Sequence, residues 1–230
     1  MDILFQDPSI LVINKPAGIP VLPDGWEKDT PYLLKLLEEE FGKLWVVHRL
    51  DKVTSGVMLF ARTAAAHRIL NIQFEHRDTL KEYHAIINGL PPWRDHIARH
   101  PLRINVGHSH RTAIDNAKGK ASETHFHVLK RYAGYCLMEV QPATGRTHQI
   151  RVHAYALGYP LLGDTLYSAP PTDLIARPAL HARLLRISHP LAGESLSFSA
   201  PYPADFKKAL EAVKAEADSG IRIVEVKDGN

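Results

Sequence analysis

Apolar and polar residues follow one another in the first part of the chain in short runs that predict strands. Residues 3–5 and 10–14 are apolar runs, and Asp7-Pro8-Ser9 between them is a composition typical of turns. The segment 15–20 contains two prolines and a glycine, which favours an irregular loop. Two short strands followed by a loop are therefore expected.

Four later segments carry apolar residues at helical spacing. Thr30 and Pro31 suit the cap and first turn of a helix that ends at Gly42. Thr147 is expected to cap a second helix, which runs to Leu157 and ends at Gly158. The remaining helices are expected at residues 64–76 and 203–218.

Strands are expected between these helices. They fall at residues 45–47, 57–61, 80–88, 123–130, 135–141, 184–188 and 196–199. Residues 91–120 have weak periodicity and are interpreted as a variable insertion, and residues 168–178 as a loop. Strands mixed with scattered helices, without a regular βαβ alternation, predict an α+β domain with a mixed, mostly antiparallel central sheet flanked by helices.

The length and composition fit one domain. The chain has 230 residues, of which 45% are apolar and 23% charged, so it can bury a substantial core and lies far from the disordered class. We expect a single domain over residues 1–217 and a C-terminal tail over residues 218–230. The tail either frays or adds a strand at residues 221–226.

Charge and cysteine content narrow the class of protein. The net charge is only +3, but the pI of about 8.9 and 14 histidines are compatible with a polyanionic partner. The single Cys136 excludes a disulfide framework and a cysteine zinc site. No signal peptide and no apolar stretch of the ~20 residues needed to cross a bilayer is found, so a soluble, cytoplasmic protein without membrane contact is expected.

The most informative local motif is His48-Arg49-Leu50-Asp51-Lys52-Val53-Thr54-Ser55-Gly56. It places one carboxylate, Asp51, between basic side chains on the connection between two predicted strands. A lone acid among cations suits an ionised nucleophile or base beside a polyanionic substrate better than it suits a metal site. Because Asp followed by Thr, Ser and Gly also suits a turn, the local residues leave both interpretations open.

Three further segments place a cation or an aromatic hydroxyl at the edge of an apolar element. They are Lys81-Glu82-Tyr83, Thr144 to His153, and Asn14 to Gly18. Arg146 lies at a predicted helix start, where a cation is unfavourable unless an anion also binds there. Taken singly, Arg151 is explained as well by a surface ion pair, and Tyr83 by a half-buried strand position.

Together these motifs resemble the RluA family of RNA pseudouridine synthases, in the stand-alone form without an S4 domain. The segments that carry the resemblance are HRLDKVTSG at 48–56, KEY at 81–83, TGRTHQIRVH at 144–153, LGYPLLGD at 157–164 and NKPAG at 14–18. The resemblance covers residues 3–201 approximately. It implies a pseudouridine synthase catalytic domain and the isomerisation of uridine in RNA without cofactor or metal.

The resemblance also implies roles for individual residues. Asp51 matches the catalytic carboxylate, Tyr83 the tyrosine that packs on the target uracil, and Arg151 the arginine that pairs with the carboxylate. Arg49 matches the position that fills the helical stack when the uridine swings out. LGYPLLGD is given no chemistry, because a helix stop and turn explain it.

The other residues expected to contact substrate follow from these roles. Ile150 is expected to form an apolar wall of the uracil pocket, and cations are expected to hold phosphates with a salt-sensitive affinity. The remaining substrate-binding candidates are Lys15, His48, Lys52 and Arg146. The implied partner is tRNA or large-subunit rRNA, and a monomer without an obligatory protein partner is expected.

Two other classes of function compete with this interpretation. A non-catalytic RNA-binding protein on the same scaffold would not need Asp51, Tyr83 and Arg151 together. A metal-dependent hydrolase is suggested by the pairs His108/His110 and His125/His127, since alternate strand residues share a face. No third ligand at suitable spacing accompanies them, so no metal site is expected.

Overall fold

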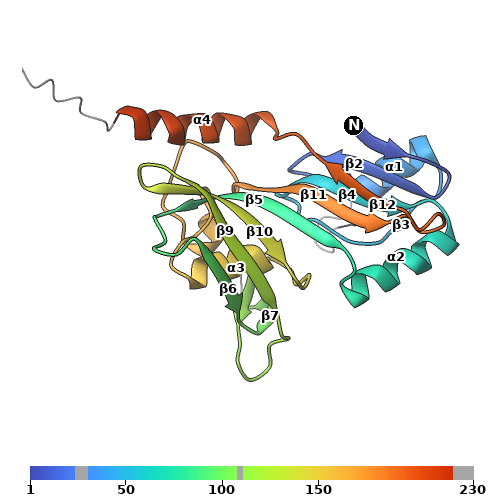
Figure 1. The fold of residues 1–230 in the computed structure, drawn as a ribbon, viewed down its shortest axis with the longest axis horizontal. Coiled ribbons are helices and arrows are strands. Elements are labelled where there is room, and N and C mark those ends of the chain that lie inside the picture. The colour runs from blue at the N-terminus through green and yellow to red at the C-terminus, as the bar shows by residue number, and fades with distance from the viewer. Residues whose placement is uncertain (24–30, 108–110, 220–230) are drawn as a thin grey trace, which may run out of the picture.

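The computed structural model describes residues 1–23, 31–107 and 111–219 (Figure 1). Ten strands form one sheet and two form a small separate sheet. The large sheet contains β1 (Asp2–Gln6), β2 (Ile10–Lys15), β3 (Trp45–Val46), β4 (Ser55–Ala61), β5 (Leu80–Asn88), β6 (Asp95–Arg99), β9 (Glu123–Arg131), β10 (Tyr135–Pro142), β11 (Leu180–Ser188) and β12 (Ser195–Ser199). The small sheet pairs β7 (Leu102–Val106) with β8 (Arg111–Ile114). The helices are α1 (Leu33–Phe41), α2 (Ala64–His76), α3 (Gln149–Ala156), α4 (Ala204–Ser219) and the short 3-10 helix η1 (Thr165–Tyr167).

The strand order of the large sheet is β1-β2-β4-β11-β5-β10-β9-β6, with β3 paired to β4 and β12 to β11. Within the described sheet, β4 and β11 run parallel, and the other paired strands run antiparallel. The predicted α+β fold with a mixed, mostly antiparallel sheet is therefore confirmed. β11, which is late in the chain, lies between β4 and β5, which are early.

Gly56 allows the parallel contact in the middle of the sheet. Ser55 and Gly56 of β4 pair with His181 and Ala182 of β11. Gly56 has a φ of +117°, and a Cβ at this position would lie 2.2 Å from the carbonyl oxygen of Ala182. Only glycine fits this backbone conformation and this close approach. The last residue of the HRLDKVTSG motif thus joins the two halves of the sheet.

Helices α1 and α2 cover opposite faces of strands β2 and β4. Alternate strand residues point to opposite faces, so one set packs on Leu33 and Leu37 of α1 and the other on Ala66 and Leu70 of α2. The first set is Leu11, Ile13, Met58 and Phe60, and the second is Ile10, Val12, Val57 and Leu59. This end of the sheet is buried on both faces, which explains its nearly continuous apolar runs.

The other end of the sheet is covered by α3 on one face and by α4 on the opposite face (Figure 1). Ile150 and Ala154 of α3 pack on inward residues of β5, β9 and β10. Phe206 and Val213 of α4 pack near Ile86, on the other side of β5. α3 therefore lies next to β5 and β10 and carries the TGRTHQIRVH motif to the middle of the molecule.

Residues 91–120 differ from the prediction. They hold β6, β7 and β8 instead of an irregular insertion. The sequence gives little signal for these strands because they are short and largely exposed. In addition, the register of β7 and β8 shifts between Arg103 and Val106, around Asn105 with its φ of 57°.

The predicted ends of the first and last helices are only partly testable. Helix α1 begins at Leu33, and the predicted cap Thr30 lies outside the described residues. Helix α4 extends to Ser219, so the boundary predicted at residue 218 falls inside it, and the possible strand at residues 221–226 also lies outside the described residues. Across the described ranges, no helix combines the length and the apolar character that a membrane span requires.

Candidate active site

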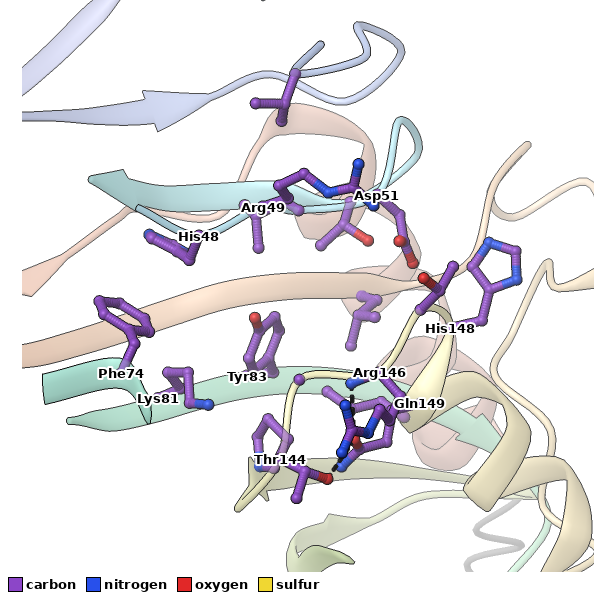
Figure 2. A pocket seen from close by; sticks show the side chains of 18 of the residues that line it. His48, Arg49, Asp51, Phe74, Lys81, Tyr83, Thr144, Arg146, His148 and Gln149 are labelled. Carbon is purple, nitrogen blue, oxygen red and sulfur yellow. Dashed lines mark hydrogen bonds between the residues drawn. The ribbon is translucent and has the colours of Figure 1, made fainter. Parts of the chain in front are cut away.

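An open cleft of about 690 Å³ lies where the two halves of the sheet meet. Its walls come from the β3–β4 connection, from α2 and β5, and from the segment between β10 and α3 (Figure 2). All the site residues predicted from the sequence line this cleft except Lys15. They are His48, Arg49, Asp51, Lys52, Tyr83, Arg146, Ile150 and Arg151.

Asp51 is half-buried on a connection that two backbone hydrogen bonds hold in place. The N–H of Thr54 donates to the carbonyl oxygen of Asp51 at 3.0 Å, and the N–H of Gly18 donates to that of Lys52 at 2.7 Å. The charge of Asp51 acts on Tyr83, His148 and Arg151, which belong to other walls of the cleft. The fold therefore places this carboxylate close enough to the other walls of the cleft for its charge to act on groups there.

Lys15 has a different position from the one expected. It is fully buried, and its Nζ donates to the carbonyl oxygens of Pro16, Asp51, Lys52 and Thr54 at 2.9, 3.3, 3.3 and 2.9 Å. The expectation that Lys15 holds a phosphate is therefore corrected: its ammonium group holds the Asp51 loop from beneath. Burial lowers the pKa of Lys15 to about 8, although the charge of Asp51 partly opposes this.

His48 lines the cleft but already uses one ring nitrogen within the protein. Its Nε2 accepts a hydrogen bond from the N–H of Leu59 at 3.0 Å, and its ring stacks on Phe74 at 4.9 Å between centroids. Burial, aided by the nearby charge of Lys81, lowers the pKa of His48 to about 3. His48 is therefore neutral at physiological pH and contributes a flat ring surface, not a positive charge.

Tyr83 stands on β5 between the Asp51 wall and the Arg146 wall (Figure 2). Burial, and to a smaller extent the charge of Asp51, raises the pKa of its phenol. The hydroxyl consequently remains protonated and can donate a hydrogen bond. The ring also packs against core residues of both halves of the sheet, which fixes its orientation.

The start of α3 is organised by Gln149 and not by the predicted cap Thr147. The residue before the helix is His148, which has left-handed backbone angles and makes no capping hydrogen bond with its side chain. Instead, Oε1 of Gln149 accepts from the N–H of Arg146 at 3.0 Å and from Oγ1 of Thr144 at 2.6 Å. Its Nε2 donates to β9, so Gln149 attaches the whole turn to the sheet.

Arg151 pairs with Asp164 and not with Asp51. Nε and Nη2 of Arg151 each lie 2.7 Å from a carboxylate oxygen of Asp164, and the two side chains are 6% and 1% exposed. The guanidinium also lies 5.0 Å from the centre of the Tyr167 ring. Burial alone would lower the pKa of Arg151, but Asp164 and then Asp51 more than offset this, and the pKa is raised. The predicted pairing is corrected accordingly: Asp51 acts on Arg151 as a nearby charge.

Sequence reasoning missed Asp164. The LGYPLLGD run was explained as a helix stop and turn, and its final acid has no local feature that marks it as the partner of a buried arginine. Lys81 and Phe74 also line the cleft, from the edge of β5 and from α2. The spacing of apolar residues along α2 predicts a helix that includes Phe74. It does not show which of these apolar side chains face a cleft.

The metal-hydrolase alternative finds no support at the histidines that suggested it. His125 contacts Glu123 at 2.7 Å and His127 contacts Asp95 at 2.6 Å, while His108 and His110 lie outside the described residues. In the part of the chain that the structure describes, one group of three side chains has the spacing of metal ligands: Glu82, His84 and Glu139. It lies outside the cleft lining.

Comparison with known proteins identifies the family. A sequence model described as RNA pseudouridylate synthase matches residues 9–156, which is more than half of the chain. The chain belongs to the RNA pseudouridine synthase family. Members of this family are isomerases, and the matched region contains Asp51, Tyr83 and Arg151.

Individual relatives agree with this assignment. The synthase is 38% identical over 206 residues to the dual-specificity RNA pseudouridine synthase RluA of Escherichia coli strain K12, covering 89% of this chain and 93% of that protein. It is 36% identical over 238 residues to the ribosomal large subunit pseudouridine synthase D of Neisseria meningitidis, covering 94% of this chain and 62% of that protein. Among solved structures, human RNA pseudouridylate synthase domain containing 4 matches with a TM-score of 0.75 and 28% identity, and 92% of each chain is covered.

Proposed function

We propose that this RNA pseudouridine synthase converts uridine in RNA to pseudouridine with Asp51 as the carboxylate that acts on the target ribose. The observation that carries the proposal is the setting of Asp51. It lies on the wall of a cleft large enough for a nucleoside, and its charge acts on four groups from three different parts of the chain, namely Lys15, Tyr83, and the pair His148 and Arg151 at the start of α3.

The chemistry requires a group of this kind. A nitrogen glycosidic bond must be exchanged for a carbon one, so the anomeric carbon must be held or activated while the uracil turns. An ionised carboxylate does this either by attacking the anomeric carbon, as in retaining glycoside hydrolysis, or by removing the neighbouring 2′ proton. In both routes the charge of the carboxylate lies close to the cations Lys15 and Arg151.

The uridine must leave its helical stack to reach Asp51, at a cost of a few kcal/mol. Arg49 is exposed beside the cleft and is proposed to occupy the space that the base leaves. The half-buried ring of Tyr83 and the side chain of Ile150 are proposed to pack on the displaced uracil. Lys52 and Arg146 are also exposed at the cleft, so they are proposed to contact phosphates, and binding should weaken as salt rises.

The proposed substrates are uridines in ribosomal or transfer RNA. The names of the relatives support this class: one is described as dual-specificity and another as acting on the ribosomal large subunit. Comparing pseudouridine positions in total RNA from cells with and without this chain identifies the uridine that is modified. A position that disappears with the chain and returns on re-expression is the expected result.

The catalytic role is tested by Asp51→Asn. We expect this nearly isosteric change to abolish tritium release from cellular RNA labelled at uracil carbon 5, while RNA affinity changes by less than about threefold, because a single charge near the ribose contributes little to binding the whole RNA. Asp173→Asn, at an exposed acid outside the cleft lining, is the matched control and should retain full turnover. Substantial turnover by Asp51→Asn would refute the proposal, and complete inactivity of the unaltered protein on every cellular RNA would favour a non-catalytic RNA-binding protein.

A further inference from the structure

The hydrogen bonds of Tyr167 fix the tautomer of His148. The Tyr167 hydroxyl oxygen lies 3.0 Å from each of three atoms: the backbone nitrogen of Thr112, the carbonyl oxygen of Thr112 and Nδ1 of His148. The carbonyl oxygen of Thr112 can only accept, so the Tyr167 hydroxyl must donate its single proton to that oxygen. Nδ1 of His148 must therefore donate its own proton to the Tyr167 oxygen.

This leaves Nε2 of His148 as a hydrogen-bond acceptor. Burial lowers the pKa of His148 although the charge of Asp51 opposes this, so the ring is neutral at physiological pH and Nε2 carries a lone pair. Across the described residues, Nε2 of His148 has no hydrogen-bond partner. This nitrogen is also not fully buried, so its lack of a partner within the protein is not a buried unsatisfied group. His148 lines the cleft, so this lone pair is accessible to a ligand there.

The backbone of His148 supports a role at this site. Its φ of 54° and ψ of 17° are left-handed angles, which are uncommon for residues other than glycine, although His adopts them more often than most. Gly or Asn would adopt them more easily. Such strain is concentrated at functional sites, and here it directs the imidazole into the cleft at the start of α3.

The position of His148 in the cleft indicates what it binds. Asp51 lies between Tyr83 and His148 (Figure 2), so a uracil on Tyr83 and a ribose at Asp51 would place His148 on the sugar side. An acceptor cannot bind phosphate oxygens, whereas the 2′-hydroxyl is a donor beside the anomeric carbon. We propose that Nε2 of His148 accepts a hydrogen bond from the 2′-hydroxyl of the target ribose and so positions the sugar against Asp51. This inference rests on the proposed function of Asp51.

The test compares a ribose with a 2′-deoxyribose at one position. The probe is a synthetic RNA hairpin that spans the uridine found by the mapping experiment, made with either uridine or 2′-deoxyuridine there. Binding of both hairpins is measured with the full-length Asp51→Asn protein, so that neither probe is converted. The variant is His148→Asn in the same background: Asn tolerates left-handed angles, its side-chain amide can still donate to Tyr167, and it has no atom at the position of Nε2.

We expect Asp51→Asn to bind the uridine hairpin about tenfold more tightly than the deoxyuridine hairpin, the ratio that one hydrogen bond provides. His148→Asn should reduce this ratio to about one by weakening the binding of the uridine hairpin alone. The melting temperature of the protein should be unchanged. An unchanged ratio would overturn the inference, as would an equal loss for both hairpins, which would mean that His148 contacts the uracil instead. Failure of the proposed function itself would appear elsewhere, as turnover by Asp51→Asn.

Discussion

Arg151 and Asp164 are two charges that the fold has removed almost completely from water. The lost hydration of each is offset mainly by the other, through two parallel hydrogen bonds of 2.7 Å. The neighbouring Tyr167 and His148 depend on the same arrangement, because the guanidinium lies against the Tyr167 ring. A change at Asp164 or Tyr167 therefore reaches the cleft, although neither side chain lines it.

Asp164→Asn should be strongly destabilising. The substitution removes the hydrogen-bonded countercharge of the buried Arg151 guanidinium, and the expected loss in the free energy of unfolding is about 3–5 kcal/mol. Urea unfolding followed by circular dichroism measures it. The control is Glu123→Gln, which removes the partner of Arg99 in a pair with exposed fractions of 64% and 31% and should barely move the midpoint. Similar midpoints for the two variants would contradict the importance assigned to the buried pair.

The motifs of the sequence predicted which residues line the cleft better than they predicted the partner of each residue. Asp51, Tyr83 and Arg151 meet in one place because three short motifs lie at the ends of elements that the sheet brings together. The partners predicted for Lys15 and Arg151 differ from those in the structure, because a charged side chain has the same sequence signature on a phosphate, a carbonyl or a buried carboxylate. Only the three-dimensional arrangement reveals these long-range partners.

At the scale of elements, the contact between β4 and β11 decides whether the cleft forms. β4 follows directly from the Asp51 loop, and β11 separates it from β5, which carries Tyr83. The parallel pairing extends over only two residue pairs, at Gly56 and its neighbour Ser55. The distance between the two key side chains therefore depends on a short stretch of backbone.

Gly56→Ala should break this contact. A Cβ would lie 2.2 Å from a backbone oxygen, and backbone cannot move aside as a flexible side chain can. We expect a loss of more than about 3 kcal/mol in the free energy of unfolding, since steric strain and an unfavourable φ act together. Differential scanning calorimetry checks this against Gly145→Ala, where an added Cβ meets nothing within 4 Å. Equal melting temperatures for the two variants would show that the sheet adapts.

The elements that periodicity predicted well are among the longer ones in the chain. Helix α2 was predicted with its observed bounds, and β5 likewise. Periodicity failed at β6 to β8, which bury few residues. It also failed at the start of α3, where the side chain of Gln149 accepts from the backbone N–H of Arg146 in place of the predicted cap Thr147. In both places, tertiary contacts override the local signal.

At the scale of the whole molecule, several histidines are buried in neutral form. Burial is the main cause that lowers the pKa of His48 to about 3 and of His84, His153 and His181 to about 4. His181 illustrates the setting: Oγ of Ser55 lies 2.9 Å from Nδ1, and the carbonyl oxygen of Ala200 lies 3.2 Å from Nε2. The neutral tautomer with its proton on Nε2 satisfies both contacts, because Nε2 donates to the carbonyl oxygen and Nδ1 accepts from the hydroxyl.

Lowering the pH should therefore begin to destabilise the protein while the pH is still above the range in which carboxylates titrate. The unfolded chain protonates its histidines below pH 6.5, whereas the folded chain keeps these four neutral until about pH 4. Unfolding thus takes up protons in this window, and stability falls as the pH is lowered through it, by on the order of 1–2 kcal/mol per buried imidazole at pH 5. Urea unfolding at pH 7.5 and pH 5 measures the difference.

A matched variant and a lower pH range separate this effect from others. His181→Asn should unfold with a weaker pH dependence between pH 7.5 and pH 5, because one titrating group is gone. The pKa values of Asp7 and Asp205 are lowered in the folded chain. Their protonation therefore reduces stability only as the pH falls below 3.8, the usual pKa of an aspartate. Equal stability of the unaltered protein at both pH values would contradict the neutral burial of these histidines.

The place of β11 in the sheet has a consequence for synthesis on the ribosome. Asp51 and Tyr83 leave the exit tunnel early, but the strand that holds their two halves in register, Leu180–Ser188, is translated about a hundred residues after Tyr83. A nascent chain that carries every motif up to His153 still lacks the centre of its sheet. The enzyme therefore cannot act on RNA near the translating ribosome until most of its own message has been decoded.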